Sequence, residues 1–312
     1  MQHRLRIGTR GSPLALWQAE AVRDALIAAH PALDADGVDI VVIRTTGDRI
    51  IDRPLVELGG KGLFTREIEA ALHAGRIDCA VHSAKDMPTE LPPGLVLGAC
   101  LERADPRDAL ISRTGGGLDN LPTGAVIGTA SLRRRAQCLA RRPDLRIVPL
   151  RGNVGTRLDK LSRREVDATL LALAGLTRLG RADAASAVLS LDEMLPAPAQ
   201  GAIAIECRAD DVAMRTLLDG VDVAATHIAI TAERAFLAAL EGSCRTPIAA
   251  FAEIAGRTLH LRGRILTPDG SACHQIAREG PAAEAAALGT AAGAALRREV
   301  GDAFLERIRA EA

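Results

Sequence analysis

The chain has 312 residues, of which 48% are hydrophobic and 25% are charged, and its formal net charge is zero. This length allows two or three domains with sizeable buried cores, and the composition excludes an intrinsically disordered protein. Only 2% of the residues are aromatic, which argues against a protein that stacks nucleic-acid bases on aromatic side chains.

The first hundred residues predict strands that alternate with helices. In chain order we expect a strand at 5–10, a helix at 12–30, a strand at 38–46, a helix at 64–76 and a strand at 77–84. Ser12 is a suitable N-cap for the first helix, and Pro13 suits its first position. We expect Thr65 to cap the second helix and Gly75 to end it.

The same alternation starts again after residue 124. We expect a strand at 125–130, a helix at 131–142, a strand at 145–152, a helix at 155–164, and a strand that runs into a helix at 166–176. Both halves contain a strand, a Gly-Thr turn and a helix capped by serine. This pattern predicts two similar α/β domains with mainly parallel sheets.

The composition also predicts two crossings between these domains and a third, smaller domain. A hinge is expected at 101–108 and a second crossing at 195–202. After about residue 222 the sequence becomes rich in alanine, and 256–270 is interpreted as a strand pair that forms a hairpin. The expected division is 1–101 with 202–220, then 106–196, and an α+β domain at 223–312.

The six cysteines are scattered without paired spacing, which argues against a disulfide framework and against a metal site. The N-terminal segment lacks the apolar core of a signal peptide, and we find no apolar stretch of transmembrane length. The expected location is therefore the cytoplasm, with no membrane partner.

Positive charge is concentrated between Gly128 and Arg181. This segment contains twelve arginines and one lysine against four acidic residues, which is 13 − 4 = +9 in a chain with no net charge. Several of these arginines follow strands, where open α/β sheets bind their ligands. Because guanidinium groups and helix N-termini bind carboxylates and phosphates, the segment predicts a polyanion site. Nucleic acid would use the same charges, but the composition disfavours it.

Four further arginines in the same segment are interpreted as a solvated charged surface. They lie within predicted helices or at helix ends, and they are Arg141, Arg142, Arg163 and Arg164.

The stretch AVHSAKDMPTELP, residues 80–92, places Lys85 and Asp86 just after a predicted strand. An ionised carboxylate there is suited to stabilise a cation in a bound substrate or to pass a proton. The alternative is a Lys-Asp pair that caps a turn, and His82 is interpreted as a structural histidine. The GGKG loop at 59–62 matches neither a P-loop nor a dinucleotide fingerprint, which disfavours an NTPase or an NAD enzyme.

Cys244 lies on a loop after a predicted helix, in EGSCRTPIAAF, residues 241–251. A loop cysteine beside Arg245 is suited to act as a nucleophile or as a covalent anchor. A small residue in a tight loop is the alternative, and the residues by themselves leave both interpretations open.

Taken together, these motifs resemble the porphobilinogen deaminase family over essentially the whole chain. The matching stretches, in order, are RIGTRGSPLALWQA, GGKGLFTREIEAAL, AVHSAKDMPTELP, DPRDALISR, IGTASLRRRAQ, LRGNVGTRLDKL, LALAGLTRLG, LPAPAQGAIAIECR and TAERAFLAALEGSCRTPI. The resemblance implies two lobes like type II periplasmic binding proteins and a third domain that carries the cysteine.

The resemblance also implies the reaction. A dipyrromethane cofactor is held by a thioether at Cys244, four porphobilinogen molecules are added to it with loss of ammonia, and hydroxymethylbilane is released by hydrolysis for tetrapyrrole and haem biosynthesis. Asp86 is the implied catalytic residue. The implied partners are porphobilinogen and uroporphyrinogen-III synthase, which receives the product, and the implied state is a monomer.

Each pyrrole carries two carboxylates, so the resemblance assigns polar and cationic residues to binding. The residues implied for the cofactor are Cys244, Lys85, Thr129, Ser131, Arg133, Arg134 and Arg151. Those implied for substrate are Arg10, Ser12, Lys61, Phe64, Arg157, Arg178 and Gln200.

Two residues depart from the family pattern, and two other classes of protein are kept as alternatives. Glu57 stands where many relatives have lysine, and Ala199 stands where glycine is common before Gln200.

The first alternative is a non-catalytic anion receptor with the same two lobes. The second is a cysteine-dependent transferase that forms only a transient acyl intermediate.

Overall fold

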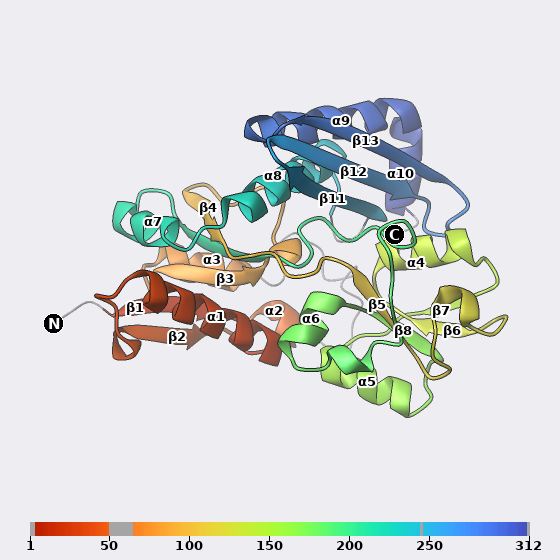
Figure 1. Cartoon of the computed structure of the whole chain (residues 1–312), viewed down its shortest axis with the longest axis horizontal. Coiled ribbons are helices and arrows are strands. Elements are labelled where there is room, and N and C mark those ends of the chain that lie inside the picture. The colour runs from red at the N-terminus through yellow and green to blue at the C-terminus, as the bar shows by residue number, and fades with distance from the viewer. Residues whose placement is uncertain (1–3, 50–64, 244–245, 311–312) are drawn as a thin grey trace. The chain divides into compact units, whose positions relative to one another are not determined.

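The computed structural model describes residues 4–49, 65–243 and 246–310. Close contacts divide the chain into two compact units, Met1–Arg103 with Ala202–His227 and Ala104–Gly201 with Ile228–Ala312. The described residues form three β-sheets, one in the first unit and two in the second (Figure 1). Each unit is described separately below.

The sheet of the first unit has the strand order β2-β1-β3-β10-β4. Its strands are β1 (Leu5–Thr9), β2 (Val38–Val42), β3 (Cys79–Ser83), β4 (Leu95–Cys100) and β10 (Ile203–Arg208). Strand β1 pairs in parallel with β2 and β3, whereas β10 runs antiparallel to both β3 and β4. The antiparallel strand is therefore the one that is reached last along the chain.

Helices cover both faces of this sheet. On one face, α1 (Pro13–Ala29) and α7 (Val212–Asp219) share an apolar core with β1, β3 and β10. On the other face, α3 (Arg66–His73) packs over Ala80 of β3 and Leu95 of β4. The short helices of the unit are α2 (Thr46–Arg49), η1 (Ala35–Gly37) and η2 (Ala84–Asp86).

The first sheet of the second unit has the order β7-β6-β8-β5-β9. Its strands are β5 (Asp108–Ser112), β6 (Val126–Gly128), β7 (Arg146–Val148), β8 (Ala168–Ala172) and β9 (Ala187–Val188). Here β5, the first strand after the chain enters the unit, is the antiparallel one. One face packs on α4 (Leu132–Arg141), and the other on α5 (Val154–Ser162) and α6 (Leu173–Arg178). The remaining short helices are η3 (Leu118–Asn120) and η4 (Ala182–Ala184).

The second sheet of this unit is antiparallel, in the order β11-β12-β13 (Figure 1). Its strands are β11 (Ile248–Ala255), β12 (Thr258–Leu266) and β13 (Cys273–Pro281). The helices are α8 (Ala224–Ala239), η5 (Ala282–Glu284), α9 (Ala285–Val300) and α10 (Asp302–Ala310). The expected hairpin within 256–270 is wrong, because this segment contains one central strand that pairs on both sides.

The expected α/β class is confirmed: two α/β sheets with mainly parallel strands, followed by a small α+β part. In each α/β sheet the first strand after a crossing of the chain is the antiparallel strand. Each crossing therefore leads into a strand that pairs on both sides, β5 after the first crossing and β10 after the second.

Helices α8 and α9 approach each other closely through glycines. A Cβ atom added at Gly289 would collide with the carbonyl oxygen of Ala232, and one at Gly293 would collide with that of Phe236. The ring of Phe236 lies in turn over Gly263 of β12, where a side chain would displace it. Small residues at these positions allow the backbone of α9 to pack directly on α8.

Two of the three expected helix caps are confirmed. The Ser12 Oγ accepts a hydrogen bond from the Ala15 N–H at 3.2 Å, and the Ser131 Oγ accepts one from the Arg134 N–H at 3.4 Å. Thr65 is the N-cap residue of α3, but the expected side-chain cap is wrong. Its backbone has φ −119° and ψ −28° instead of the extended geometry that capping side chains need, and it makes no capping hydrogen bond.

Ala199 departs from the glycine expected by the resemblance, yet it has a backbone φ of +63°. This left-handed region costs residues with a Cβ atom about 1–2 kcal/mol. The Ala199 N–H donates to Glu233 Oε2 at 2.5 Å, which holds the strained conformation in place. The chain therefore keeps the local backbone shape at the expense of some strain.

We expect Ala199→Gly to raise the free energy of unfolding by about 0.5–1 kcal/mol, because glycine adopts positive φ without the Cβ penalty. Chemical unfolding monitored by circular dichroism measures the change. The matched control is Ala202→Gly, a buried neighbour whose backbone does not have positive φ. It should lower stability by about 1 kcal/mol, and equal effects of the two substitutions would contradict the assignment of strain.

Candidate functional site

A small hollow in the first unit brings together three residues that the sequence assigned to the site. Arg10 and Ser12 follow β1, Asp86 follows β3, and all three line a cavity of about 70 Å³. Strands β1 and β3 are parallel neighbours, so their carboxyl ends meet at the same edge of the sheet. The position of Asp86 at this edge agrees with its expected place at the end of a strand.

The hollow also contains a polar residue that sequence reasoning missed. Gln18 lies on the buried face of α1 and is 2% exposed. Its Nε2 donates to the Ser83 Oγ at 2.9 Å, which joins α1 to the end of β3. The sequence signal that could have revealed Gln18 is its position on the apolar face of the helix, where it shares that face with alanine and valine.

Lys85 and Asp86 lie in η2, which continues β3 at its carboxyl end. Asp86 is exposed and points its carboxylate toward the hollow, whereas Lys85 is half-buried. An accessible carboxylate at this position is suited to face a positive charge on a bound molecule.

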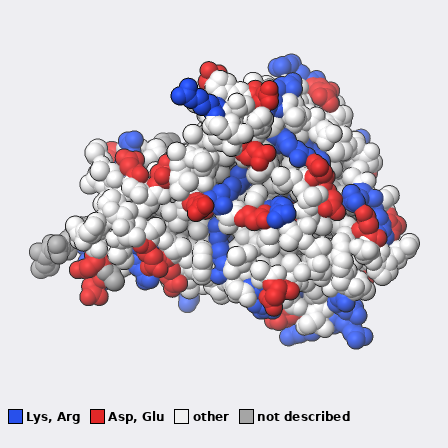
Figure 2. Space-filling view, viewed as in Figure 1, with Lys and Arg blue, Asp and Glu red and all other residues white. Residues whose placement is uncertain are grey.

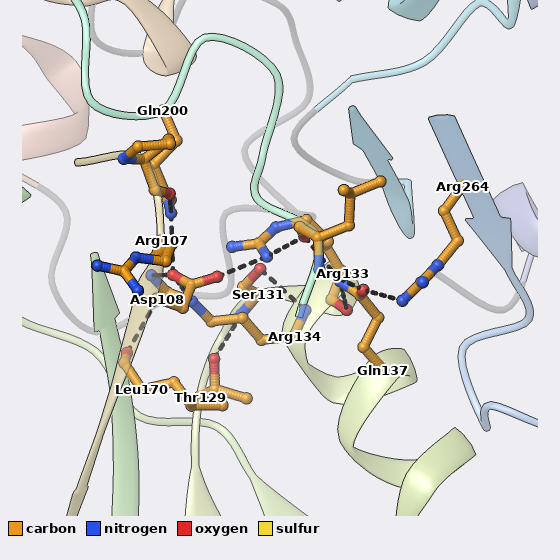
Figure 3. Close-up of polar contacts among 12 residues, drawn as sticks. Arg107, Asp108, Thr129, Ser131, Arg133, Arg134, Gln137, Leu170, Gln200 and Arg264 are labelled. Carbon is orange, nitrogen blue, oxygen red and sulfur yellow. Dashed lines mark hydrogen bonds and ion pairs between the residues drawn. The ribbon is translucent and has the colours of Figure 1, made fainter. Parts of the chain in front are cut away.

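In the second unit, one buried carboxylate holds two arginines (Figure 3). The Arg133 Nη1 lies 2.7 Å from Asp108 Oδ2, and the Arg134 Nη2 lies 2.7 Å from Asp108 Oδ1. All three side chains are less than 10% exposed. Both guanidinium groups also donate to backbone carbonyls, Arg133 to Leu195 and Arg134 to Leu170. The sequence did not identify Asp108 as their partner.

The electrostatics of this group favour an added anion. Burial opposes ionisation of Asp108, but the two guanidinium groups outweigh it and hold the pKa of the carboxyl well below its usual range. The two guanidinium groups and the single Asp108 carboxylate together have a net charge of 2 − 1 = +1, which is buried inside the protein. In addition, the buried Arg133 Nε has no hydrogen-bond partner among the described residues. Uncompensated buried charge is costly, so a carboxylate ligand would be stabilised here.

Gln200 lies where the chain leaves the unit, and it contacts the same carboxylate. Its Nε2 donates to Asp108 Oδ1 at 3.0 Å and to the carbonyl of Pro106 at 2.7 Å (Figure 3). Thr129 and Ser131 lie between β6 and α4, and the Ser131 N–H donates to the Thr129 Oγ1 at 3.2 Å. Thus the structure places five of the assigned residues, Gln200 included, around the start of α4 and β5.

The other assigned arginines of the second unit are half-buried. The Arg157 Nε donates to the carbonyl of Gly152 at 2.9 Å, and the Arg178 Nη2 donates to that of Gly201 at 2.6 Å. Burial lowers the pKa of Arg178 to about 10, so its side chain is still protonated at neutral pH. Arg151 follows β7, and its carbonyl accepts from Lys160 Nζ at 3.5 Å.

A hydrogen-bonded chain of side chains connects the arginine pair to the third sheet. Gln137 on α4 donates to the carbonyl of Leu195, the same oxygen that Arg133 contacts. The Gln137 Oε1 accepts from the Leu195 N–H and from the Arg264 Nη1 of β12 at 2.8 Å (Figure 3). Sequence reasoning missed Gln137, because nothing in its helical position indicates these distant partners.

A second connection runs through Glu233 on α8. Its side chain is fully buried, and its two oxygens accept from the Ala199 N–H and from the Ala252 N–H of β11. One carboxylate therefore joins the helix, the crossing segment before Gln200 and the antiparallel sheet.

Surface ion pairs account for much of the positive charge counted in the sequence. Arg141 pairs with Asp119, and Arg142 pairs with Asp144 at 2.7 Å. These contacts confirm the interpretation of Arg141 as a surface charge, whereas Arg142 is 18% exposed and also donates to the carbonyls of Leu118 and Leu121. Acidic and basic side chains are interspersed over the visible face in Figure 2. The count of +9 overstated the free charge, because Asp108 and Asp119 lie outside the counted segment.

Three assigned residues lie outside the described residues: Cys244, Lys61 and Phe64. Glu57, one of the two departures from the family pattern, lies outside them as well.

One other group of potential ligands occurs in the described part of the first unit: Cys100, Asp222 and His227. The Asp222 Oδ1 accepts from the Cys100 N–H at 2.7 Å, and the His227 Nδ1 lies 3.0 Å from the same oxygen. These hydrogen bonds connect β4 to the start of α8, and we interpret the group as a structural connection.

Among the described helices, none combines the length and the apolar character needed to cross a bilayer.

Two models of one known protein family match most of the chain. The family model "Porphobilinogen deaminase, dipyromethane cofactor binding domain" matches residues 5–216, and "Porphobilinogen deaminase, C-terminal domain" matches residues 227–298. The chain belongs to the porphobilinogen deaminase family. The expected resemblance is therefore confirmed over most of the sequence.

Similar proteins carry the same name. The porphobilinogen deaminase of Paracoccus denitrificans is 58% identical over 93% of this chain and 92% of its own length. That of Nitrobacter winogradskyi is 54% identical over 96% of this chain and 94% of its own length. The chloroplastic porphobilinogen deaminase of Oryza sativa is 54% identical over 89% of this chain and 78% of its own length.

Solved structures with a similar arrangement of elements are more distant. They include the VFT2 domain of Bordetella pertussis BvgS, with a TM-score of 0.42, 14% identity, and coverage of 70% of this chain and 85% of that one. A TRAP periplasmic solute binding protein from Desulfovibrio salexigens has a TM-score of 0.43, 10% identity, and coverage of 71% and 73%.

We expect Asp108→Asn to lower the free energy of unfolding by about 3–5 kcal/mol, because it leaves two buried guanidinium groups without a counter-charge. The control is Asp105→Asn, which removes the partner of Arg107 in a more exposed pair at 2.6 Å. It should cost less than about 1 kcal/mol. Similar losses in urea unfolding of the two variants would contradict the importance of the buried group.

The same carboxyl makes stability depend on pH. Its folded-state pKa is depressed, so its contribution is present above the unfolded value of about 3.9 and is lost as pH falls toward the folded value. Between about pH 4 and pH 2, thermal unfolding of the native protein should therefore lose stability more steeply than that of Asp108→Asn.

Proposed function

We propose that the chain is a transferase that joins porphobilinogen units with loss of ammonia, extends a dipyrromethane primer with four of them, and releases hydroxymethylbilane by hydrolysis. The relatives named porphobilinogen deaminase support this activity, which belongs to tetrapyrrole and haem biosynthesis. The structural observation that carries the proposal is the buried arginine pair with its excess positive charge. Oligopyrroles bear two carboxylates on each ring and supply the missing anions.

The family model named for the cofactor binding domain matches residues 5–216, which include Lys85 and the buried arginine pair. Dipyrromethane, when bound through a thioether to Cys244, supplies a tethered pyrrole to which substrate is added. The side chains that we propose to hold its carboxylates are Lys85, Thr129, Ser131, Arg133, Arg134 and Arg151. The unpartnered Arg133 Nε among the described residues supports this assignment, because a carboxylate oxygen would satisfy it.

For the substrate and the growing product, we assign a second set of binding residues. They are Arg10, Ser12, Lys61, Phe64, Arg157, Arg178 and Gln200. Arg10 and Ser12 support the assignment best, because they line the hollow next to Asp86. Gln200 acts through Asp108, since its amide donates to that carboxylate.

Asp86 is the proposed catalytic residue. When ammonia leaves porphobilinogen, the remaining methylene carbon and pyrrole ring share a positive charge. A carboxylate at the edge of the hollow stabilises this charge and the N–H groups of the ring by electrostatic attraction and hydrogen bonding. Its exposure leaves the carboxylate accessible to an incoming substrate.

We also propose how the protein is organised and where it acts. Three domains, 1–101 with 202–220, 106–196 and 223–312, correspond to the three sheets. The free thiols of the described cysteines are compatible with a reducing cytoplasm. We expect a monomer that passes its product to uroporphyrinogen-III synthase.

An intact-mass measurement tests the covalent cofactor. The purified protein should be heavier than its sequence, and Cys244→Ser should remove the extra mass together with the colour reaction of pyrroles with Ehrlich reagent. Cys273→Ser is the matched control, because Cys273 is an exposed thiol elsewhere in the chain. A native mass equal to the sequence mass, in a sample that binds oligopyrroles, would favour an anion receptor or a transient acyl transferase instead.

Replacement of Asp86 tests the chemical step. Asp86→Asn should lower kcat for ammonia release from porphobilinogen about 100-fold or more, while the cofactor mass is retained. Glu90→Gln, an exposed carboxylate a few residues further along, is the control and should keep kcat within about twofold. Near-normal turnover by Asp86→Asn would refute the catalytic role.

A further inference from the structure

Three ionisable side chains lie together beneath the hollow that contains Asp86. They are His82 on β3, Glu206 on β10 and Glu69 on α3, and their exposed fractions are 6%, 0% and 8%. We refer to them as the His82 cluster. None of them belongs to the binding residues assigned above, and ionisable groups this deeply buried require a physical reason.

The sheet itself brings the cluster together. Alternation along β3 points Cys79 and Val81 toward α1, and Ala80 and His82 toward the opposite face. In the antiparallel register, Ala80 faces Glu206 of β10, so Glu206 lies on the same face as His82. The His82 Nε2 and the Glu206 Oε2 are 3.1 Å apart.

The cluster is poorly satisfied by the described part of the protein. The Glu206 Oε1 and the Glu69 Oε1 are both buried and have no hydrogen-bond partner among the described residues. Burial raises the pKa of Glu69, and the nearby Glu206 carboxylate adds to this effect. Glu69 therefore holds a proton more readily than a surface glutamate, and it lies beside the hydrogen-bonded pair of His82 and Glu206.

Other elements around the cluster contribute few charges. Thr65, His82 and Arg66 each act to lower the pKa of Glu69, against the larger effect of burial, and α1 contributes the neutral amide of Gln18. Arg10 and Asp86 line the same hollow as His82, and Thr65 lies at its edge. His82 is thus the member of the cluster that reaches the cavity, with two carboxyl groups behind it.

The reaction requires a group of this kind, provided that the proposed function is correct. The carbon–nitrogen bond of porphobilinogen breaks with its electron pair on nitrogen, and this nitrogen needs one proton to leave as ammonia. The pyrrole carbon that forms the new carbon–carbon bond then loses its hydrogen as one proton. Each addition therefore consumes one proton and returns one, with no net change.

We propose that His82 is a catalytic residue that gives the proton to the departing amine and takes it back from the pyrrole carbon. Glu206 is a positioning residue that stabilises the protonated imidazole, and Glu69 lies behind the pair. This assignment separates two roles: the exposed Asp86 stabilises positive charge, and the buried cluster transfers the proton. A histidine is suited to this task, because it exchanges protons near neutral pH.

The experiment compares His82→Gln and Glu206→Gln with the native, cofactor-loaded protein. His82→Gln should lower kcat for ammonia release about 100-fold with KM changed less than about twofold. Its pH–rate profile should lose the limb that depends on a protonated group. Glu206→Gln should lower kcat about tenfold and shift this limb. The control His30→Gln changes a half-buried histidine of the same unit, whose Nε2 contacts the carbonyl of Leu217, and should leave the profile unchanged.

A readout independent of turnover is the NMR titration of the histidine ring protons. The signal absent from His82→Gln should move with pH over the interval in which kcat changes, and Glu206→Gln should displace that interval. Ehrlich reagent confirms that each variant carries its cofactor.

Distinct outcomes would overturn the two proposals. A native protein that releases no ammonia from porphobilinogen refutes the proposed function itself. If the native protein is active and His82→Gln keeps the native pH–rate profile, the role of His82 is refuted and its contribution is structural. If His82→Gln does not fold, Glu206→Gln decides, because an unchanged profile and an unchanged histidine titration in this variant also refute the proposal.

Discussion

The carboxylate of Asp108 is the contact on which the second unit depends. It lies at the first residue of β5, just after the chain enters the unit, and it binds two guanidinium groups from α4. Gln200, at the point where the chain leaves, donates to the same carboxylate. One buried carboxylate therefore joins three places: the point where the chain enters the unit, the point where it leaves, and the arginine pair. Because a guanidinium fork has a fixed geometry, this contact also sets the direction in which Arg133 and Arg134 face.

The third sheet is coupled to this group through two side chains that were not assigned to the binding site, Gln137 and Glu233. Gln137 connects Arg264 of β12 to the backbone that Arg133 contacts, and Glu233 connects β11 to the residue before Gln200. The side chains of Gln137 and Glu233 are both buried, and buried polar groups that lose a partner are costly. The part of the protein that carries the cysteine loop and the part that carries the arginines are thus held in one network.

Local features were the part of the fold that the sequence could predict. The serine caps, the βα alternation and the position of Arg10, Ser12 and Asp86 after strands depend on residues within a few positions of each other. Strands β4, β5 and β10 were not predicted, because β5 and β10 belong to their sheets only through partners far along the chain. The role of Asp108 was hidden for the same reason, since its arginines follow 25 and 26 residues later. His82 was interpreted as structural because its partner Glu206 is 124 residues away.

The close contact between α8 and α9 has a consequence for how a tethered product can grow. A side chain at Gly289 or Gly293 would collide with the backbone of α8, so the two helices pack in direct contact, and α8 ends five residues before position 244. The thioether therefore attaches the oligomer to the chain only a few residues beyond a tightly packed pair of helices. Because each new unit is added to the free end of the primer, every further ring lies one unit farther along the oligomer from that attachment.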